Sequence, residues 1–343
     1  MKKIYLLSIL MCASLVSTQC KKEDNSDPLK KEETKPSLKD FSLSQNNVSL
    51  TKETEQKIEI TSGNNEYTFE QSEEDKKIAQ VSLSSDKKEV VIKALTEGKI
   101  SIKITDVPSK KEISLVIFVF SKVTPQDYEL SQDKKTLIKW KGAHTKSLDM
   151  NIFQELKNIT AIEKDAFKRH ENIEVVIFPE KITSIGDRVF YGCEKLKEVT
   201  IPDSVTSLGG ASFSGCVNLE KVNLPKGITL IDAVTFYNCK NIREITIPEK
   251  VTKVDWNAFS GTGIKELVFP SSIKNLDTGI VDSCKDLEKI VFKGDTPPSI
   301  KYNSLKRNVE NPPLKIYVPK EKKQTYIESS KYWKELEELI IES

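Results

Sequence analysis

The chain has 343 residues, of which 37% are hydrophobic and 30% charged, and its 53 basic and 51 acidic side chains leave a formal net charge of +2. Because no large field of one sign acts at long range, we expect no nucleic-acid partner. The hydrophobic share is low for one compact globule and favours an elongated molecule with much surface per residue.

Residues 1–19 have the pattern of a targeting segment. Two lysines precede an apolar run from Ile4 to Val16 that is too short for a comfortable membrane span. The segment resembles a bacterial lipoprotein signal, with the small residue Ser17 three positions before Cys20. The resemblance implies lipidation of Cys20 and anchoring to the membrane by acyl chains. The alternative is an ordinary secretory peptide with a cysteine at this place by chance.

Residues 20–37 form a charged segment, in which ten of the sixteen side chains from Lys21 to Pro36 are charged. Such a segment buries too little apolar surface to offset the entropy of ordering, so we expect a disordered tether. The Lys-Lys-Glu-Asp run directly after Cys20 resembles a surface-export signal of lipoproteins in bacteria with two membranes. The resemblance implies an outer-membrane lipoprotein displayed at the cell surface.

Residues 38–122 contain short runs of β-branched and aliphatic residues, separated by turn-forming sequences at roughly ten-residue spacing, which is typical of an antiparallel β-sandwich. The expected strands are Val48–Leu50, Lys57–Ile60, Tyr67–Phe69, Val90–Ile92, Ile100–Ile104 and Ile113–Phe120. The sequences that begin at Ile78, Val90 and Glu97 resemble the strands of bacterial Ig-like domains of group 2. This resemblance implies an Ig-like module that acts as a spacer, with direct ligand binding as the alternative.

Residues 123–343 contain a phrase that recurs every 23 residues, with one 22-residue step at Gly261–Gly263. A fixed period of this length predicts a solenoid, whose turns bury their apolar side chains against neighbouring turns. In each turn a Leu-x-x-Val-x-Ile segment predicts a short strand with inward-facing side chains, which a proline ends. The phenylalanine that fills the next corner stands at Phe167, Phe190, Phe213, Phe236 and Phe259.

The run from Ile201 to Pro225 and its neighbours resemble leucine-rich repeats of the BspA type, which occur in bacterial surface proteins. The segment Tyr128–Trp140 resembles the N-terminal cap of that family, and Ile316–Pro319 with Tyr326 and Trp333 resembles its C-terminal unit. The resemblance implies a mainly β protein with a capped leucine-rich-repeat solenoid over residues 123–343. It also implies adhesion, through binding of a host or bacterial surface protein or of a glycan.

One column of the repeat holds four cysteines: Cys193, Cys216, Cys239 and Cys284. Thiols in one column lie about 5 Å apart along the array and do not converge on a point, so we expect no metal site. The main expectation is a line of buried free thiols, and one disulfide is the alternative. Neither His144 nor His170 has a nucleophile and base at catalytic spacing, so we expect no enzyme, no catalytic residue and no cofactor.

Candidate contact residues lie outside the core columns of the repeat. Two outward columns carry charges of mostly opposite sign in successive turns, which predicts a self-neutralising face, with a charge-patterned recognition face as the alternative. A third outward column is apolar at both ends, and three aromatic side chains near the Phe column have no role set by the repeat. The six candidates are Ile177, Val268, Val291, Tyr191, Tyr237 and Trp256.

Two functional hypotheses remain at this point. The leading one is a monomeric adhesin that binds a protein through the strand face of the solenoid. The alternative is a glycan-binding or envelope-scaffold lipoprotein, in which the sandwich or the aromatic corner makes the contact. A purely structural role of the three aromatic residues, as filler between turns, is also open.

Overall fold

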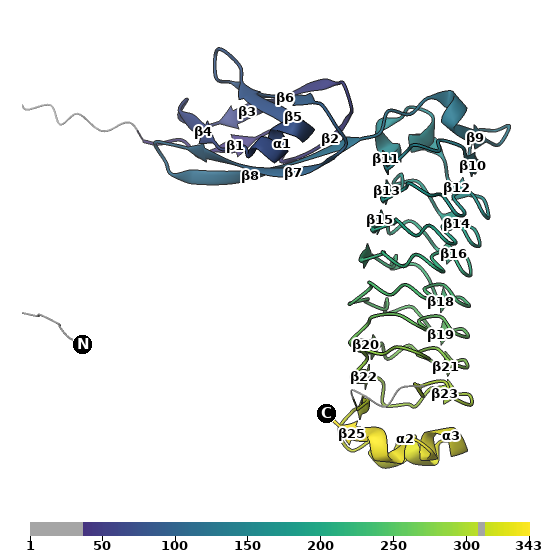
Figure 1. Ribbon diagram of the computed structural model, residues 1–343. Coiled ribbons are helices and arrows are strands. Elements are labelled where there is room, and N and C mark those ends of the chain that lie inside the picture. Colours follow the sequence, from purple (N-terminus) through teal and green to yellow (C-terminus); the bar gives the residue numbers. More distant parts are fainter. Residues whose placement is uncertain (1–36, 308–312) are drawn as a thin grey trace, which may run out of the picture. The chain divides into compact units, whose positions relative to one another are not determined.

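The computed structural model describes residues 37–307 and 313–343, which are mainly β with few helices (Figure 1). The expected signal segment, the lipidation site Cys20 and the tether up to residue 36 lie outside the described residues. Two separate clusters of buried hydrophobic side chains divide the described chain. The first extends from Phe41 to Val119, and the second extends from Leu137 to Ile340.

Two four-stranded sheets share the N-terminal cluster. The first has the order β1 (Ser42–Leu43), β3 (Glu55–Ser62), β6 (Glu89–Ala94), β5 (Ala79–Leu83), and the second has the order β2 (Asn47–Thr51), β8 (Lys111–Phe120), β7 (Gly98–Asp106), β4 (Tyr67–Phe69). Alternate residues of the long strands are buried, as Ile100, Ile102 and Ile104 are in β7. Each sheet therefore turns one apolar face to the shared core, and all six expected strand runs lie in strands.

This part differs in two ways from a purely antiparallel sandwich. The strands β2 and β8 pair in parallel, with Val48 opposite Ile117, whereas the other strand pairs of these two sheets are antiparallel. A helix that the sequence did not predict, α1 (Glu73–Ile78), precedes β5. It begins after Ser72, whose hydroxyl accepts the Asp75 N–H while the Asp75 carboxylate accepts the Ser72 N–H.

The solenoid has about eight turns, which stack in sequence order (Figure 1). It starts with an antiparallel hairpin of β9 (Tyr128–Leu130) and β10 (Thr136–Trp140). Parallel strands then form two walls. The first wall contains β11 (Ser147–Asp149), β13 (Val175–Ile177), β15 (Glu198–Thr200), β17 (Lys221–Val222), β20 (Glu266–Phe269), β22 (Lys289–Phe292), β24 (Lys315–Val318) and β25 (Ile340–Glu342). The second contains β10, β12 (Ala161–Ile162), β14 (Ser184–Ile185), β16 (Ser207–Leu208), β18 (Leu230–Ile231), β19 (Lys253–Val254), β21 (Asn275–Leu276) and β23 (Ser299–Ile300).

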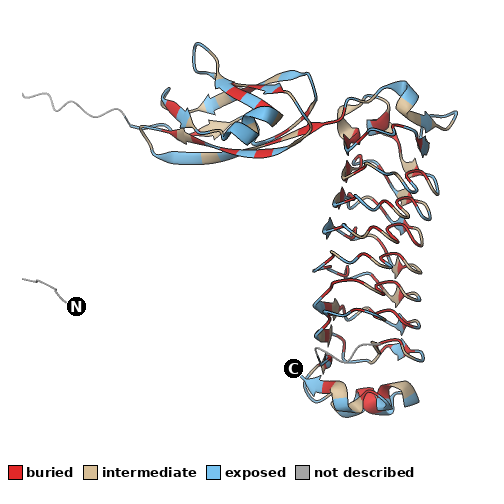
Figure 2. Ribbon diagram, in the orientation of Figure 1, coloured by how far each residue is buried: buried red, intermediate tan, exposed pale blue. Residues whose placement is uncertain are grey.

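A column of stacked aromatic rings fills the corner that follows the second wall, from the turn of Trp140 to the turn of Phe259. Neighbouring ring centroids lie 5.0 to 5.7 Å apart from Trp140 through the five phenylalanines of the repeat. All five phenylalanine side chains are buried, and buried residues follow the inner side of the turns in Figure 2. Each stacked pair adds roughly 0.5–1.5 kcal/mol beyond the burial of the rings.

Backbone hydrogen bonds hold the same corner at the same spacing. The Phe190 N–H donates to the Ser212 carbonyl oxygen at 2.8 Å, and the Phe213 N–H donates to that of Thr235 at 3.0 Å. In each turn the residue two positions before the Phe column has a positive φ, between 49° and 66°. These residues are Asp165, Arg188, Ala211, Val234, Asn257, Gly279 and Asn303.

The ladder of the first wall is interrupted in the turn from Ile242 to Pro248. The repeat predicted a strand there, and this prediction was wrong, because the segment is not part of a sheet. Within the described chain, its backbone meets the strand of the next turn in one long hydrogen bond, from the Lys265 N–H to the Arg243 carbonyl oxygen at 3.5 Å. The next turn is one residue shorter than the others before it, at Gly261–Gly263.

The C-terminal unit covers the last turn with α2 (Lys323–Glu328) and α3 (Lys331–Lys334). Tyr326 and Trp333 are fully buried, with ring centroids 5.0 Å apart in an edge-to-face arrangement. The Tyr326 hydroxyl donates to the Gly294 carbonyl oxygen at 2.6 Å, and the Trp333 Nε1 donates to that of Pro298 at 2.9 Å. Both polar groups are thus satisfied inside the cap. Short 3-10 turns occupy Pro125–Asp127, Met150–Ile152, Leu156–Asn158 and Glu337–Leu339.

Replacing Val234 by Asn should stabilise the protein by roughly 1 kcal/mol, because a β-branched residue at a φ of 49° is strained and Asn tolerates this region. Urea unfolding of both proteins measures the difference. The reciprocal variant Asn257→Val, in the same column at a φ of 52°, should lose stability. If Val234→Asn unfolds at a lower urea concentration than the parent, backbone strain is not the controlling factor at this corner.

Candidate functional site

The six candidate residues fall on two distinct surfaces of the solenoid. Ile177, Val268 and Val291 lie on strands of the first wall, on the side opposite to the buried residues of the same strands. We call this outward side the strand face. The aromatic candidates Tyr191, Tyr237 and Trp256 lie around the Phe corner.

An apolar row runs across four consecutive strands of the strand face. Val268 of β20 is opposite Val291 of β22, which is opposite Tyr317 of β24, and Tyr317 is opposite Ile341 of β25. We call these four residues the apolar row. The first three are half-buried, and Ile341 is 36% exposed. Ile177 lies outside the row, because its partners are Asp149 and Thr200.

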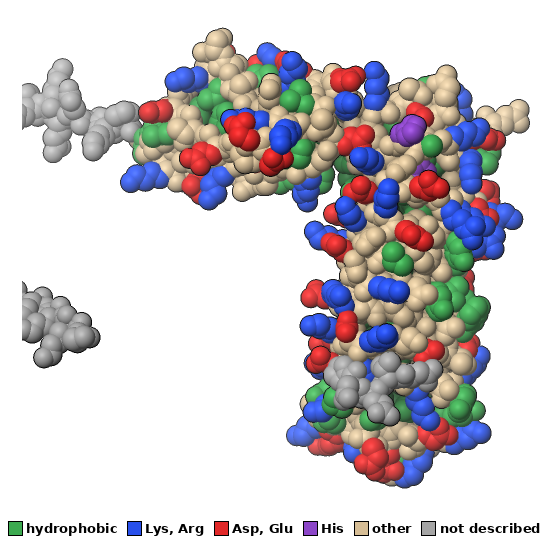
Figure 3. Space-filling model, in the orientation of Figure 1, with side chains coloured by type: hydrophobic (Ala, Val, Ile, Leu, Met, Phe, Trp, Pro, Cys, Tyr) green, Lys and Arg blue, Asp and Glu red, His purple; other side chains and the backbone are tan. Residues whose placement is uncertain are grey.

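Charges on the strand face largely pair with one another. The Lys197 ammonium lies 2.6 Å from the Glu174 carboxylate of the preceding turn, and the Lys289 ammonium lies 3.0 Å from that of Glu266. Figure 3 shows basic and acidic side chains interspersed along the visible side of the solenoid. These ion pairs agree with the prediction of a self-neutralising face. Lys289 also stands over the Tyr317 ring, 5.2 Å from its centroid, beside the apolar row.

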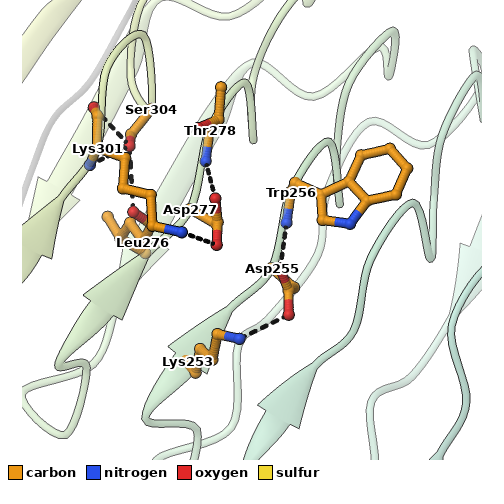
Figure 4. A network of polar contacts seen from close by, with 8 residues as sticks. All are labelled: Lys253, Asp255, Trp256, Leu276, Asp277, Thr278, Lys301 and Ser304. Carbon is orange, nitrogen blue, oxygen red and sulfur yellow. Dashed lines mark hydrogen bonds and ion pairs between the residues drawn. The ribbon is translucent and has the colours of Figure 1, made fainter.

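Trp256 comes directly after Asp255, which belongs to a polar network on the second wall (Figure 4). The Asp255 carboxylate accepts the Trp256 N–H at 2.8 Å and the Lys253 ammonium at 2.7 Å, and the Asp277 carboxylate accepts the Thr278 N–H and the Lys301 ammonium in the same way. Burial acts to raise the pKa of Asp277, but these hydrogen bonds outweigh it and lower that pKa. The indole itself is 48% exposed and projects away from the network.

A groove of 780 Å³ lies between Tyr191 and Tyr237, which come from turns two apart. Ser214, from the turn between them, lines the groove together with Gly192 and Gly215. Trp256 does not line it, so the structure brings together only two of the three aromatic candidates. The sequence offered no signal for Ser214 or the two glycines, because small residues in a repeat column stand out only once their neighbours in adjacent turns are known.

The four cysteines of the repeat are buried and free. Each thiol donates to the carbonyl oxygen of the Phe one turn earlier, over sulfur–oxygen distances of 3.0 to 3.1 Å. Burial raises the pKa of the Cys193 thiol to about 12. Among residues 37–307 and 313–343, no group of three His, Cys, Asp or Glu side chains is placed to hold a metal ion. The column therefore acts as a structural link between turns.

His170 occupies the cysteine column one turn before Cys193. Its Nε2 donates to the Gly142 carbonyl oxygen at 2.9 Å, and its Nδ1 accepts the Ile173 N–H at 3.0 Å, so the ring is neutral with its proton on Nε2. Burial lowers the pKa of His170, although the Gly142 hydrogen bond and Glu171 act in the opposite direction. His144 is exposed. Neither histidine has a catalytic neighbour in these contacts.

No helix among the described residues has the length and hydrophobicity that crossing a bilayer requires.

The repeats match a known family model. Residues 160–288 match, in six copies, the model described as "BspA type Leucine rich repeat region". These residues are therefore similar to BspA-type leucine-rich repeats. No curated protein matches the chain.

Three solved structures of bacterial leucine-rich repeat proteins are similar in part. A leucine rich cell surface protein of Faecalibacterium prausnitzii is 23% identical over 53% of this chain and 56% of its own, with a TM-score of 0.40. The Leucine Rich Repeat protein of T. pallidum is 21% identical over 50% and 85%, with a TM-score of 0.44. A leucine-rich repeat protein of Bacteroides ovatus is 15% identical over 58% and 82%, with a TM-score of 0.26. The chain thus spans little more than half of the Faecalibacterium protein.

The four thiols of the leucine-rich repeat solenoid should resist alkylation in the folded protein. The thiolate is the reactive species, and burial raises the pKa of every one of these thiols. Iodoacetamide treatment followed by mass spectrometry should leave the four sites unlabelled in buffer and fully labelled in urea. Labelling of Cys216 or Cys239 in the native protein would show that the column opens without global unfolding.

The stability of the leucine-rich repeat solenoid should fall as the pH decreases below 6.5, the ordinary pKa of histidine. The unfolded chain binds a proton at His170 more readily than the folded chain does, so unfolding is favoured on the acid side. The variant His170→Cys carries the residue of the later turns and should show a shallower slope. Equal slopes of urea midpoint against pH in the two proteins would rule out this contribution.

Proposed function

We propose that the chain is a surface lipoprotein whose solenoid binds a protein partner through the strand face. The observation that carries this proposal is the apolar row. In the preceding turns the same outward column holds the polar residues Thr200, Asn223 and Thr246. From Val268 onward it is apolar in four consecutive strands, and neither core cluster of the described residues includes these side chains.

The surroundings of the row suit a protein partner. Four strands spaced about 4.8 Å apart extend the row over roughly 15 Å, which is too long for one small ligand and is continuous with the rest of the face. Tyr317 offers the rigid aromatic surface that is common at the centre of protein interfaces. The Glu266–Lys289 pair beside it supplies a polar rim whose charges are already balanced. The partner we propose is a host or bacterial surface protein, and the chain itself acts as a monomer.

The anchoring part of this proposal rests on the sequence alone. Residues 1–19 would be removed as a lipoprotein signal, Cys20 would carry the lipid, and residues 21–37 would tether the folded part to the outer membrane. The N-terminal sheets would serve as an Ig-like spacer. Their strand orders, β1-β3-β6-β5 and β2-β8-β7-β4, support this idea, because they follow the ABED and GFC orders of an immunoglobulin-type sandwich.

We further propose that the protein catalyses no reaction and needs no cofactor. The contacts of His170 and of the four repeat cysteines are explained by the structure of the solenoid, and many of its surface carboxylates pair with lysines or arginines. A leucine-rich repeat solenoid offers long outer surfaces, which suits binding better than chemistry.

The double variant Val291→Thr/Tyr317→Thr should lose at least tenfold in affinity for the protein partner. Threonine keeps the β-propensity of these outward positions and removes the apolar surface, so the fold is retained. The measurement is saturation binding of cells displaying the full chain to a panel of immobilised extracellular-matrix proteins and intact bacterial cells.

Ile177→Thr is the matched control for this experiment, because it makes a similar change in the same column outside the row. It should bind as the parent does. The proposal fails if the parent shows no saturable binding to any member of the panel. It also fails if the double variant binds unchanged, because the row then makes no contact.

A further inference from the structure

We propose that the groove between Tyr191 and Tyr237 is a binding site for a neutral oligosaccharide. The site lies at the Phe corner, and its lining includes no residue of the apolar row. It is therefore independent of the protein-binding function proposed above. Three features point to this ligand: the spacing of the two tyrosines, the floor between them and the balance of polar groups on the rim.

The backbone fixes the distance between the two tyrosines. The Gly192 N–H donates to the Ser214 carbonyl oxygen at 2.8 Å, and the Gly215 N–H donates to that of Tyr237, also at 2.8 Å. Tyr191, Ser214 and Tyr237 thus occupy the same place in three hydrogen-bonded turns. Two steps of about 4.8 Å place the two tyrosine backbones roughly 10 Å apart. A rigid corner of this kind keeps the site formed before any ligand arrives.

One face of the Tyr191 ring is occupied. The Lys168 ammonium, from the turn before Tyr191, stands over that face, 5.9 Å from the ring centroid. A ligand can therefore stack only on the opposite face of Tyr191. A ring packed between two aromatic faces needs about 3.5–4 Å on each side, or roughly 7–8 Å in total. The backbone separation of the two tyrosines, roughly 10 Å, is slightly more than this, which leaves room for a thick, puckered sugar ring as well as for a flat aromatic one.

The floor of the groove is small and polar. Ser214 is only 5% exposed, and no residue of the described chain hydrogen-bonds its hydroxyl, which lines the groove. A Cβ added to Gly215 would meet nothing closer than the Gly192 backbone at 3.6 Å, so this position is open toward the groove. The phenol hydroxyls of Tyr191 and Tyr237 likewise have no hydrogen-bond partner in the described part of the chain. Unpartnered hydroxyl groups beside a buried floor are suited to a ligand rich in hydroxyl groups.

The rim distinguishes a sugar from other ligands that stack on tyrosine. Arg169, Lys195 and Lys240 supply donors, whereas Glu171 and Glu194 supply acceptors. Three positive and two negative charges make a nearly neutral rim, which gives little attraction for a polyanion. A proline-rich peptide also packs in aromatic grooves, but its prolines offer only carbonyl acceptors and would leave the two glutamates without partners. Sugar hydroxyls both donate and accept, so they match both kinds of rim residue.

The test is isothermal titration of the full chain with tetrasaccharides of glucose, mannose, galactose and N-acetylglucosamine. We expect at least one of them to bind, and Tyr191→Ala and Tyr237→Ala should each weaken this binding by about tenfold or more. Gly215→Asn should abolish it, because the new side chain fills the floor while Asn tolerates the φ of 76° at this position. Asn already occupies the same column one turn later, at Asn238.

Matched controls separate a binding role from a structural one. Ser214→Ala should weaken binding several-fold, whereas Ser260→Ala, an equally buried serine of the same column outside the groove, should leave it unchanged. The urea midpoint of each variant reports whether the solenoid is intact. Three results would overturn the proposal: no tetrasaccharide binds at millimolar concentration, binding survives both Tyr→Ala changes, or a proline-rich peptide binds in the groove and no sugar does.

Discussion

The stacked phenylalanine column and the backbone ladder beside it hold the solenoid together, and the remaining contacts between turns adapt to them. The strand ladder of the first wall stops in the turn from Ile242 to Pro248, yet the Phe236 ring keeps centroid distances of 5.5 and 5.7 Å to its neighbours. In the same turn the Phe236 N–H still donates to the Ala258 carbonyl oxygen at 2.8 Å. Continuity of the array at this turn therefore depends on the corner rather than on the sheet of the first wall.

This constraint accounts for the residues that the repeat uses most strictly. The thiol of the cysteine column finds its acceptor on the Phe of the turn before, so the same turn spacing satisfies a ring contact and a buried donor. The positive φ before each Phe makes the chain bend sharply enough to point the ring inward. Where the column has a β-branched residue, as at Val234, the bend persists because the stacked rings on both sides define it.

Periodicity in the sequence predicted the features that recur from turn to turn, namely the Phe column, the buried cysteines and the short strands of the first wall. It could not predict the interruption at Ile242–Pro248, because this segment keeps the residues of the repeat and its pairing depends on both neighbouring turns. The sequence did not predict Tyr317 and Ile341 as candidate residues for a related reason. Tyr317 follows Val291 by 26 residues and Ile341 follows Tyr317 by 24, so a 23-residue register aligns neither of them with Val268.

The candidate sites were partly predictable in the same sense. Tyr191 and Tyr237 stood out because the repeat gives them no role, but the groove between them also requires small residues in the intervening turn. Ser214 and Gly215 are ordinary members of their columns and become significant only through residues 23 positions away on either side. The sequence thus predicts the residues that stand out from the repeat, such as the two tyrosines, more readily than the small residues between them.

The balance of charge suggests what kind of recognition the molecule performs. Exposed ion pairs such as Lys197–Glu174 contribute little to stability, since solvent screens them. Their main effect is to cancel the fields of neighbouring turns, in keeping with a net charge of +2 over the whole chain. A partner is therefore not steered from a distance. It must be recognised at contact, by apolar and aromatic groups. The strand face and the tyrosine groove present such groups on a rigid solenoid.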